Sequence, residues 1–220
     1  MSIKSFAVIT AAIMIATTTS ASDMTFEGDR VKCEFASPQS AQLFVTAKEA
    51  AVASPLSAAK LLRSIFYRYR GTSTNAGTPE ADECLAVLTM QELNDMRIAY
   101  VAREYPEVSA KELEASWKKG GLGRIFMDKG EREKVIPALV AESRFLSSPA
   151  QILSWAVFRA GIRGIPRFDP TLYSFYMEMA EEGSPRYQYY LGEIYANGYG
   201  QAKDDAISKK WFTASGMEKP

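Results

Sequence analysis

The sequence predicts an all-α protein built of antiparallel helix hairpins, and three observations lead to this fold class. Prolines repeatedly follow a good helix-capping residue, glycines stand where helical patterns end, and strand patterns are nearly absent. A Ser, Thr or Asp at the cap accepts hydrogen bonds from the first turn, and proline at the first helical position loses none. Six such pairs mark helix starts: Ser37-Pro38, Ser54-Pro55, Thr78-Pro79, Ser148-Pro149, Asp169-Pro170 and Ser184-Pro185.

A seventh start and the helix ends follow from the same local chemistry. Ser109 and Glu112 have the spacing of a capping box, and glycines end the helical patterns because glycine adopts positive φ without strain. Residues 24–35 alternate weakly between apolar and polar side chains, which leaves a short strand open there. We expect helices near residues 38–52, 55–69, 79–104, 110–119, 131–146, 149–160, 170–182, 185–197 and 203–215, with longer loops at 70–78 and 120–130.

Residues 1–22 have the order of a secretory signal peptide. Lys4 supplies a positive charge, residues 6–16 are almost entirely apolar, and small residues follow. The apolar run is much shorter than the roughly 20 residues of a transmembrane helix. The alternative is a retained anchor, which threonines at 17–19 disfavour because they would sit poorly in lipid. We expect an exported bacterial protein, periplasmic or secreted, without membrane insertion after cleavage.

Charge and composition narrow the classes of function. The chain has 26 basic and 26 acidic residues, so it has no electrostatic reason to bind nucleic acid or an anionic membrane. It contains no histidine, which excludes histidine-dependent triads and zinc sites and removes the usual acid–base group near pH 7. The sequence therefore predicts no catalytic residues, no cofactor and no metal site.

The two cysteines, Cys33 and Cys84, suggest one disulfide in an oxidising compartment. The bond would close a loop of about fifty residues and attach the N-terminal segment to the predicted hairpin at 38–69. The alternative is a pair of buried free thiols. Residues 23–147 otherwise form a helical region of unassigned type.

Residues 148–217 contain two related units. The stretch from Gln151 to Gly161 reads QILSWAVFRAG, and the stretch from Gln188 to Gly198 reads QYYLGEIYANG. In each, an aromatic residue, Phe158 or Tyr195, stands three positions before the glycine. Units of about 36 residues that each hold two helices predict a short solenoid.

The second unit carries a longer pattern, made of Gln188, Tyr189, Leu191, Gly192, Tyr195, Gly198, Gly200, Asp204, Trp211 and Phe212. With this pattern the unit resembles a Sel-1-like repeat, a relative of the tetratricopeptide repeat. It departs from the family at Tyr187, Ser208, Ser215 and Gly216, and the first unit is a degenerate copy. The resemblance implies that the hairpins end in a short right-handed α-solenoid that binds another protein.

The repeat residues also have direct physical roles. We expect Leu191, Tyr195 and Trp211 to fill the core of the last hairpin. Gly192 lies in mid-helix, where glycine costs about 1 kcal/mol relative to alanine, so two helices are expected to cross closely there. Gly198 and Gly200 allow the positive φ angles of a helix-ending turn.

The function expected from these features is non-enzymatic protein binding. Tyr187, Tyr190 and Tyr199 fall outside the family's core pattern and are candidate partner-contact residues, because aromatic residues dominate binding hot spots; packing is the alternative for each. The resemblance implies an adaptor, a regulator, or an immunity protein that neutralises a secreted toxin. An alternative of another class is a carboxylate-dependent cell-wall hydrolase in residues 23–147.

Overall fold

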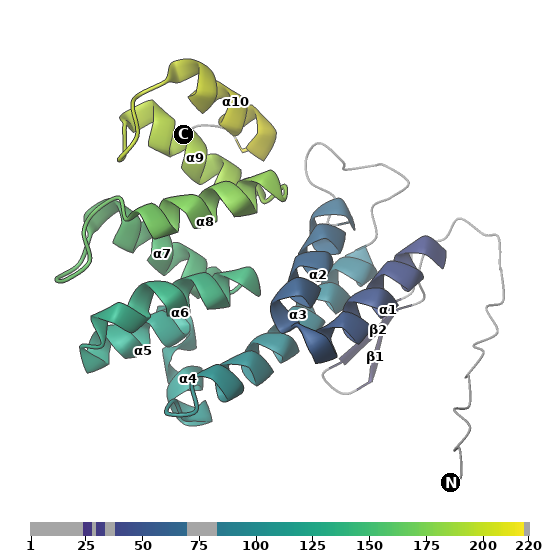
Figure 1. Ribbon diagram of the computed structural model, residues 1–220. Helices are drawn as coiled ribbons and strands as arrows, with labels where there is room; N and C mark the ends of the chain where they lie inside the picture. The colour runs from purple at the N-terminus through teal and green to yellow at the C-terminus, as the bar shows by residue number, and fades with distance from the viewer. Residues whose placement is uncertain (1–23, 28–29, 34–37, 70–82, 218–220) are drawn as a thin grey trace, which may run out of the picture.

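The computed structural model describes residues 24–27, 30–33, 38–69 and 83–217, and this part of the chain is mostly helical, as the sequence predicts. Two short antiparallel strands precede the helices, with Met24 opposite Cys33 and Glu27 opposite Arg30. The elements are β1 (Met24–Glu27), β2 (Arg30–Cys33), α1 (Pro38–Ala53), α2 (Pro55–Tyr69), α3 (Glu83–Glu104), α4 (Ala110–Ser116), the 3-10 turn η1 (Trp117–Lys119), α5 (Gly121–Lys129), α6 (Arg132–Arg144), α7 (Ser148–Ala160), α8 (Pro170–Glu181), α9 (Pro185–Asn197) and α10 (Asp205–Ser215) (Figure 1).

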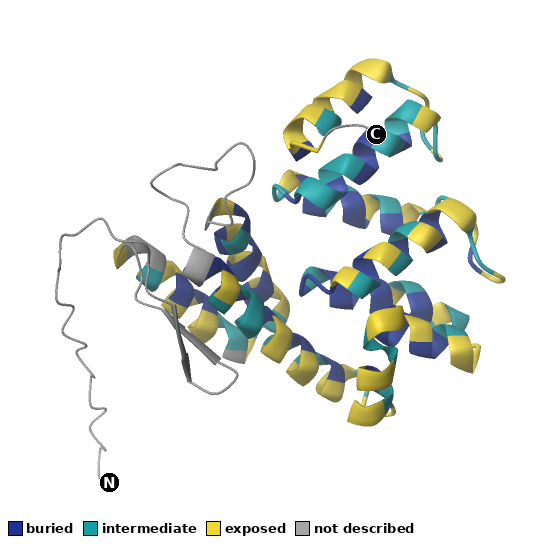
Figure 2. Ribbon diagram, turned by 180° about the vertical axis from the view of Figure 1, so that it is seen from behind, coloured by how far each residue is buried: buried dark blue, intermediate teal, exposed yellow. Residues whose placement is uncertain are grey.

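The helices form two groups. In the first, α1 packs on α2 and α2 on α3, with β2 against α3. In the second, the helix pairs α5/α6, α7/α8 and α9/α10 stack in chain order, and each pair also packs on the next (Figure 1). Buried residues lie mainly where helices face one another, and exposed residues lie mainly on the outer faces (Figure 2). None of the described helices is long and apolar enough to span a membrane.

The capping argument holds at some helix starts and fails at others, since the cap residues Ser147 of α7 and Ser184 of α9 make no side-chain cap hydrogen bond. The Ser109 side chain and Glu112 form a complete capping box at α4. Asp169 caps α8 by accepting hydrogen bonds from the backbone N–H groups of its first turn. At α7 the prediction is off by one residue, because Ser147 occupies the cap position and Ser148 already lies in the helix. The predicted start at Thr78-Pro79 lies outside the described residues.

Helix α5 corrects the predicted loop at 120–130. Gly120 and Gly121 both have positive φ, so the chain turns sharply before the helix begins. Leu122 and Phe126 are buried at helical spacing. The helix start is capped from a distance, since the Glu142 carboxylate on α6 accepts a hydrogen bond of 2.7 Å from the Leu122 N–H. A local sequence pattern does not reveal such a cap.

The last helix pair confirms the predicted glycine roles. A β-carbon on Gly192 would lie 2.7 Å from the Phe212 ring, so α9 and α10 approach closely there. Gly198 ends α9 in the left-handed conformation, and Gly200 also has a positive φ of 71°. Leu191 is fully buried, whereas Tyr195 and Trp211 are half-buried and pack against the core from its edge.

Two sequence predictions fall on parts of the chain that the structure does not describe. The signal peptide at 1–22 lies outside the described residues. The same holds for the side chains of Cys33 and Cys84, so their pairing stays a prediction.

Candidate functional site

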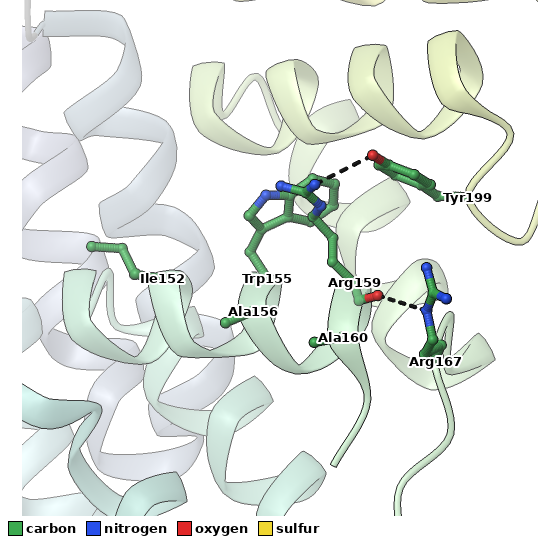
Figure 3. Close-up of a pocket in the computed structure, with 7 residues that line it drawn as sticks. All are labelled: Ile152, Trp155, Ala156, Arg159, Ala160, Arg167 and Tyr199. Carbon is green, nitrogen blue, oxygen red and sulfur yellow. Dashed lines mark hydrogen bonds between the residues drawn. The ribbon is translucent and has the colours of Figure 1, made fainter.

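An open groove of about 420 Å³ lies along α7 and the turn that follows α9 (Figure 3). We call it the α7 groove. Figure 3 shows its lining residues, which come from three separate segments of the chain. They are Ile152, Trp155, Ala156, Arg159, Ala160, Arg167 and Tyr199.

Beside the groove, a row of contacts joins α7 to α9 and to the turn that follows α9. Residues four apart on a helix share a face, and three such residues of α7 each meet a partner. Gln151 accepts a 2.9 Å hydrogen bond from Arg186. Trp155 stacks on Tyr190 with ring centroids 4.3 Å apart and nearly parallel planes. At the third position, Arg159 donates to the hydroxyl of Tyr199 at 3.3 Å.

The neighbouring row of α7 is the apolar floor of the groove. Ile152, Ala156 and Ala160 are all exposed, with Ile152 60% accessible. A branched aliphatic side chain that is this exposed beside a tryptophan gains free energy when a partner covers it. The floor is therefore the apolar element of the groove.

Two arginines supply the polar element. The Arg159 guanidinium lies 5.8 Å from the centroid of Trp155 and 5.3 Å from that of Tyr199. Arg167 donates through Nε to the main-chain carbonyl of Arg159 at 2.9 Å, and its guanidinium is 4.8 Å from the ring of Phe168. Arginine has five N–H donors, so each guanidinium is held in place with several donors still available to a ligand.

These arginines differ from most others in how they are paired. Among the described residues, Arg63, Arg97, Arg103, Arg124 and Arg144 each make an ion pair with a carboxylate. No such pair within the described part of the chain involves Arg159, Arg163 or Arg167. The acidic residue nearest in sequence, Asp169, accepts hydrogen bonds from the first turn of α8. The groove lining therefore has two arginines and no acidic residue.

The structure separates the tyrosines that the sequence grouped as partner contacts. Tyr187 is fully buried and Tyr190 is 8% exposed, and burial raises the pKa of both phenols. Neither ring can reach a partner, so both are corrected to packing residues. Their burial follows from the helix pairing, since Tyr187 packs on Tyr176 and Tyr190 on Trp155. Tyr199 is half-buried and lines the groove.

A second set of charged residues lies at the junction between the two helix groups. Arg97 on α3 donates to Glu142 on α6 at 2.9 Å, and both side chains are buried. Burial raises the pKa of Glu142 and lowers that of Arg97, while their mutual attraction opposes both shifts. Arg63 on α2 donates twice to Glu182 and once to the carbonyl of Arg144. These groups are held by one another and do not line the groove.

Sequence reasoning missed most of the groove. Ile152, Trp155, Arg159 and Arg167 were not among the predicted contact residues, although a signal was present. From 159 to 168 the chain reads RAGIRGIPRF, which has three arginines and no acidic residue. The four-residue spacing of Trp155 and Arg159 places them on one helix face, but only the fold brings Tyr199 to them.

Comparison with protein-family models, with curated proteins and with solved structures finds no match. The likeness to Sel-1-like repeats therefore rests on the sequence pattern alone.

Proposed function

We propose that this chain is an exported, non-enzymatic protein-binding module of Sel-1-like helical repeats, and that it binds its partner through the α7 groove. The observation that carries the proposal is the groove's composition. It combines an exposed Ile152 with Trp155, Tyr199 and two arginines. Tryptophan, tyrosine and arginine are the residue types enriched in binding hot spots.

The shape of the groove also favours a macromolecular partner. A small-molecule site is a cleft that buries most of its ligand, whereas the α7 groove is largely open to solvent. A protein that covers the apolar floor would exclude water from the arginines and strengthen their hydrogen bonds. The aromatic contacts with α9 keep the groove in shape before binding, which lowers the entropic cost of association.

The biological role would follow from the partner. An adaptor or a regulator binds a component of the envelope, and an immunity protein binds a secreted toxin with tight one-to-one stoichiometry. Each of these roles requires the same surface to bind, so one set of variants tests them together.

The test is affinity capture by the mature chain from envelope extract, followed by titration with the purified partner. Ile152→Asp places a charge on the floor of the groove, and we expect it to weaken binding by about tenfold or more. Ile207→Asp is the matched control, because Ile207 is an exposed isoleucine of α10 that does not line the groove. Failure to capture a stoichiometric partner, or equal binding by both variants, would contradict the proposal.

A further inference from the structure

We infer that the partner segment held by the α7 groove is an extended acidic peptide with an aliphatic or aromatic anchor residue. This inference rests on the proposed function and names the chemistry of the partner. The anchor would cover the apolar floor at Ile152 and Ala156, and the carboxylates would accept hydrogen bonds from Arg159 and Arg167.

The groove lining is complementary in charge to an acidic segment. The lining includes two arginines and no acidic residue, and Arg163 in the same turn is exposed. An arginine fork binds a carboxylate with two parallel hydrogen bonds, which are about twice as strong as neutral ones. A basic segment would meet like charges here, which disfavours its binding.

The two guanidiniums are held in fixed positions. Arg159 is held by its hydrogen bond to Tyr199, and Arg167 by its hydrogen bond to the Arg159 carbonyl (Figure 3). The Arg167 guanidinium also lies near the ring of Phe168, and that of Arg159 near the ring of Tyr199. These two rings stack on each other with centroids 5.6 Å apart. The two guanidiniums and the apolar floor beside them would therefore contact a segment in which acidic and apolar side chains alternate.

The dimensions agree with a short extended segment. Ile152 and Arg159 lie about 10 Å apart along the axis of α7, from the helical rise per residue. An extended chain covers that distance in about three residues. An apolar anchor and an acidic residue three positions later can therefore reach the floor and Arg159 together.

The probe for the test is a fluorescent peptide of about eight residues in which glutamates flank a central leucine. One comparison peptide has lysines in place of the glutamates, and another has glycine in place of the leucine. We expect the acidic peptide to bind the full-length mature chain about tenfold more tightly than either comparison peptide. Polarisation of the peptide fluorescence measures this difference.

The variant Arg159→Glu/Arg167→Glu should weaken binding of the acidic peptide by about tenfold or more. The matched control, Arg124→Glu/Lys209→Glu, makes the same change in net charge at exposed residues that do not line the groove. It should bind like the unmodified chain. Arg159→Gln/Arg167→Gln keeps both side chains polar and should also lose binding, which guards against a folding defect from charge reversal.

The outcomes separate this inference from the proposed function. If the captured partner is lost with Ile152→Asp but retained with Arg159→Glu/Arg167→Glu, the groove binds protein and the acidic class is wrong. If no captured partner depends on Ile152, the proposed function itself fails. Binding to phosphatidylglycerol vesicles without binding to the acidic peptide would overturn the inference in favour of an anionic membrane surface. Equal affinity for the lysine peptide would also overturn it.

Discussion

The junction between the helix groups and the α7 groove use arginine in opposite ways. At the junction, Arg63 and Arg97 are 1% and 5% exposed, and each donates to a glutamate from a distant helix. In the groove, Arg159 and Arg167 are exposed and have no carboxylate partner within the described residues. A buried guanidinium must be paired within the fold because an unpaired buried charge is strongly destabilising. An exposed one is free to serve recognition.

The contrast between paired and unpaired arginines shows which charges connect the two helix groups. Arg63 connects α2 with the C-terminal ends of α6 and α8, and Arg97 connects α3 with α6 and the start of α5. Their partners are 119 and 45 residues away in sequence. Changes at the junction should therefore alter stability, and changes in the groove should alter binding.

The largest effect is expected for Glu142→Ala. It leaves the Arg97 guanidinium buried without its carboxylate and removes the acceptor of the Leu122 N–H. We expect the free energy of unfolding to fall by about 3–5 kcal/mol, measured by urea denaturation. Arg97→Met/Glu142→Met removes both charges and should recover part of the loss. A double variant no more stable than Glu142→Ala would show that the buried charge is not the cause.

Arg63→Met should have a smaller effect. Lys60 stands 3.6 Å from the other oxygen of Glu182, so the carboxylate keeps a cation nearby. The hydrogen bonds to a charged group support a loss of about 2 kcal/mol in the free energy of unfolding. The control is Arg103→Met, an exposed arginine of α3 that pairs with its neighbour Glu104. Its expected loss is below about 0.5 kcal/mol, and equal losses would erase the difference between buried and exposed pairs.

A small effect on stability is expected in the groove itself. Arg159→Ala and Arg167→Ala remove exposed side chains whose contacts are with aromatic rings, the Tyr199 hydroxyl and one carbonyl. Each should change the free energy of unfolding by less than about 1 kcal/mol, as thermal or urea unfolding would show. A loss as large as that of Arg63→Met would mean that these arginines also hold the fold, and the comparison with the junction would break down.

Local sequence chemistry predicted the helices well where the caps are local. Ser109 with Glu112 and Asp169 with Pro170 mark true starts because each cap lies within the same turn of chain. The start of α5 was missed because its cap comes from Glu142, on another helix. The groove shows the same difference between local and long-range signals. Tyr199 was predicted from the sequence as a contact residue, whereas the α7 residues beside it were not.

The sequence by itself determined the helical class, most helix boundaries and the close crossing at Gly192, because capping, glycine conformation and side-chain spacing act within a few residues. Only the tertiary structure decided which aromatic rings are buried and which arginines are paired. Tyr187 lies on α9 and Tyr199 in the turn that follows it, yet the first lies in the core and the second lines the groove. Burial and pairing depend on which helices meet, and that is a property of contacts between residues far apart in the chain.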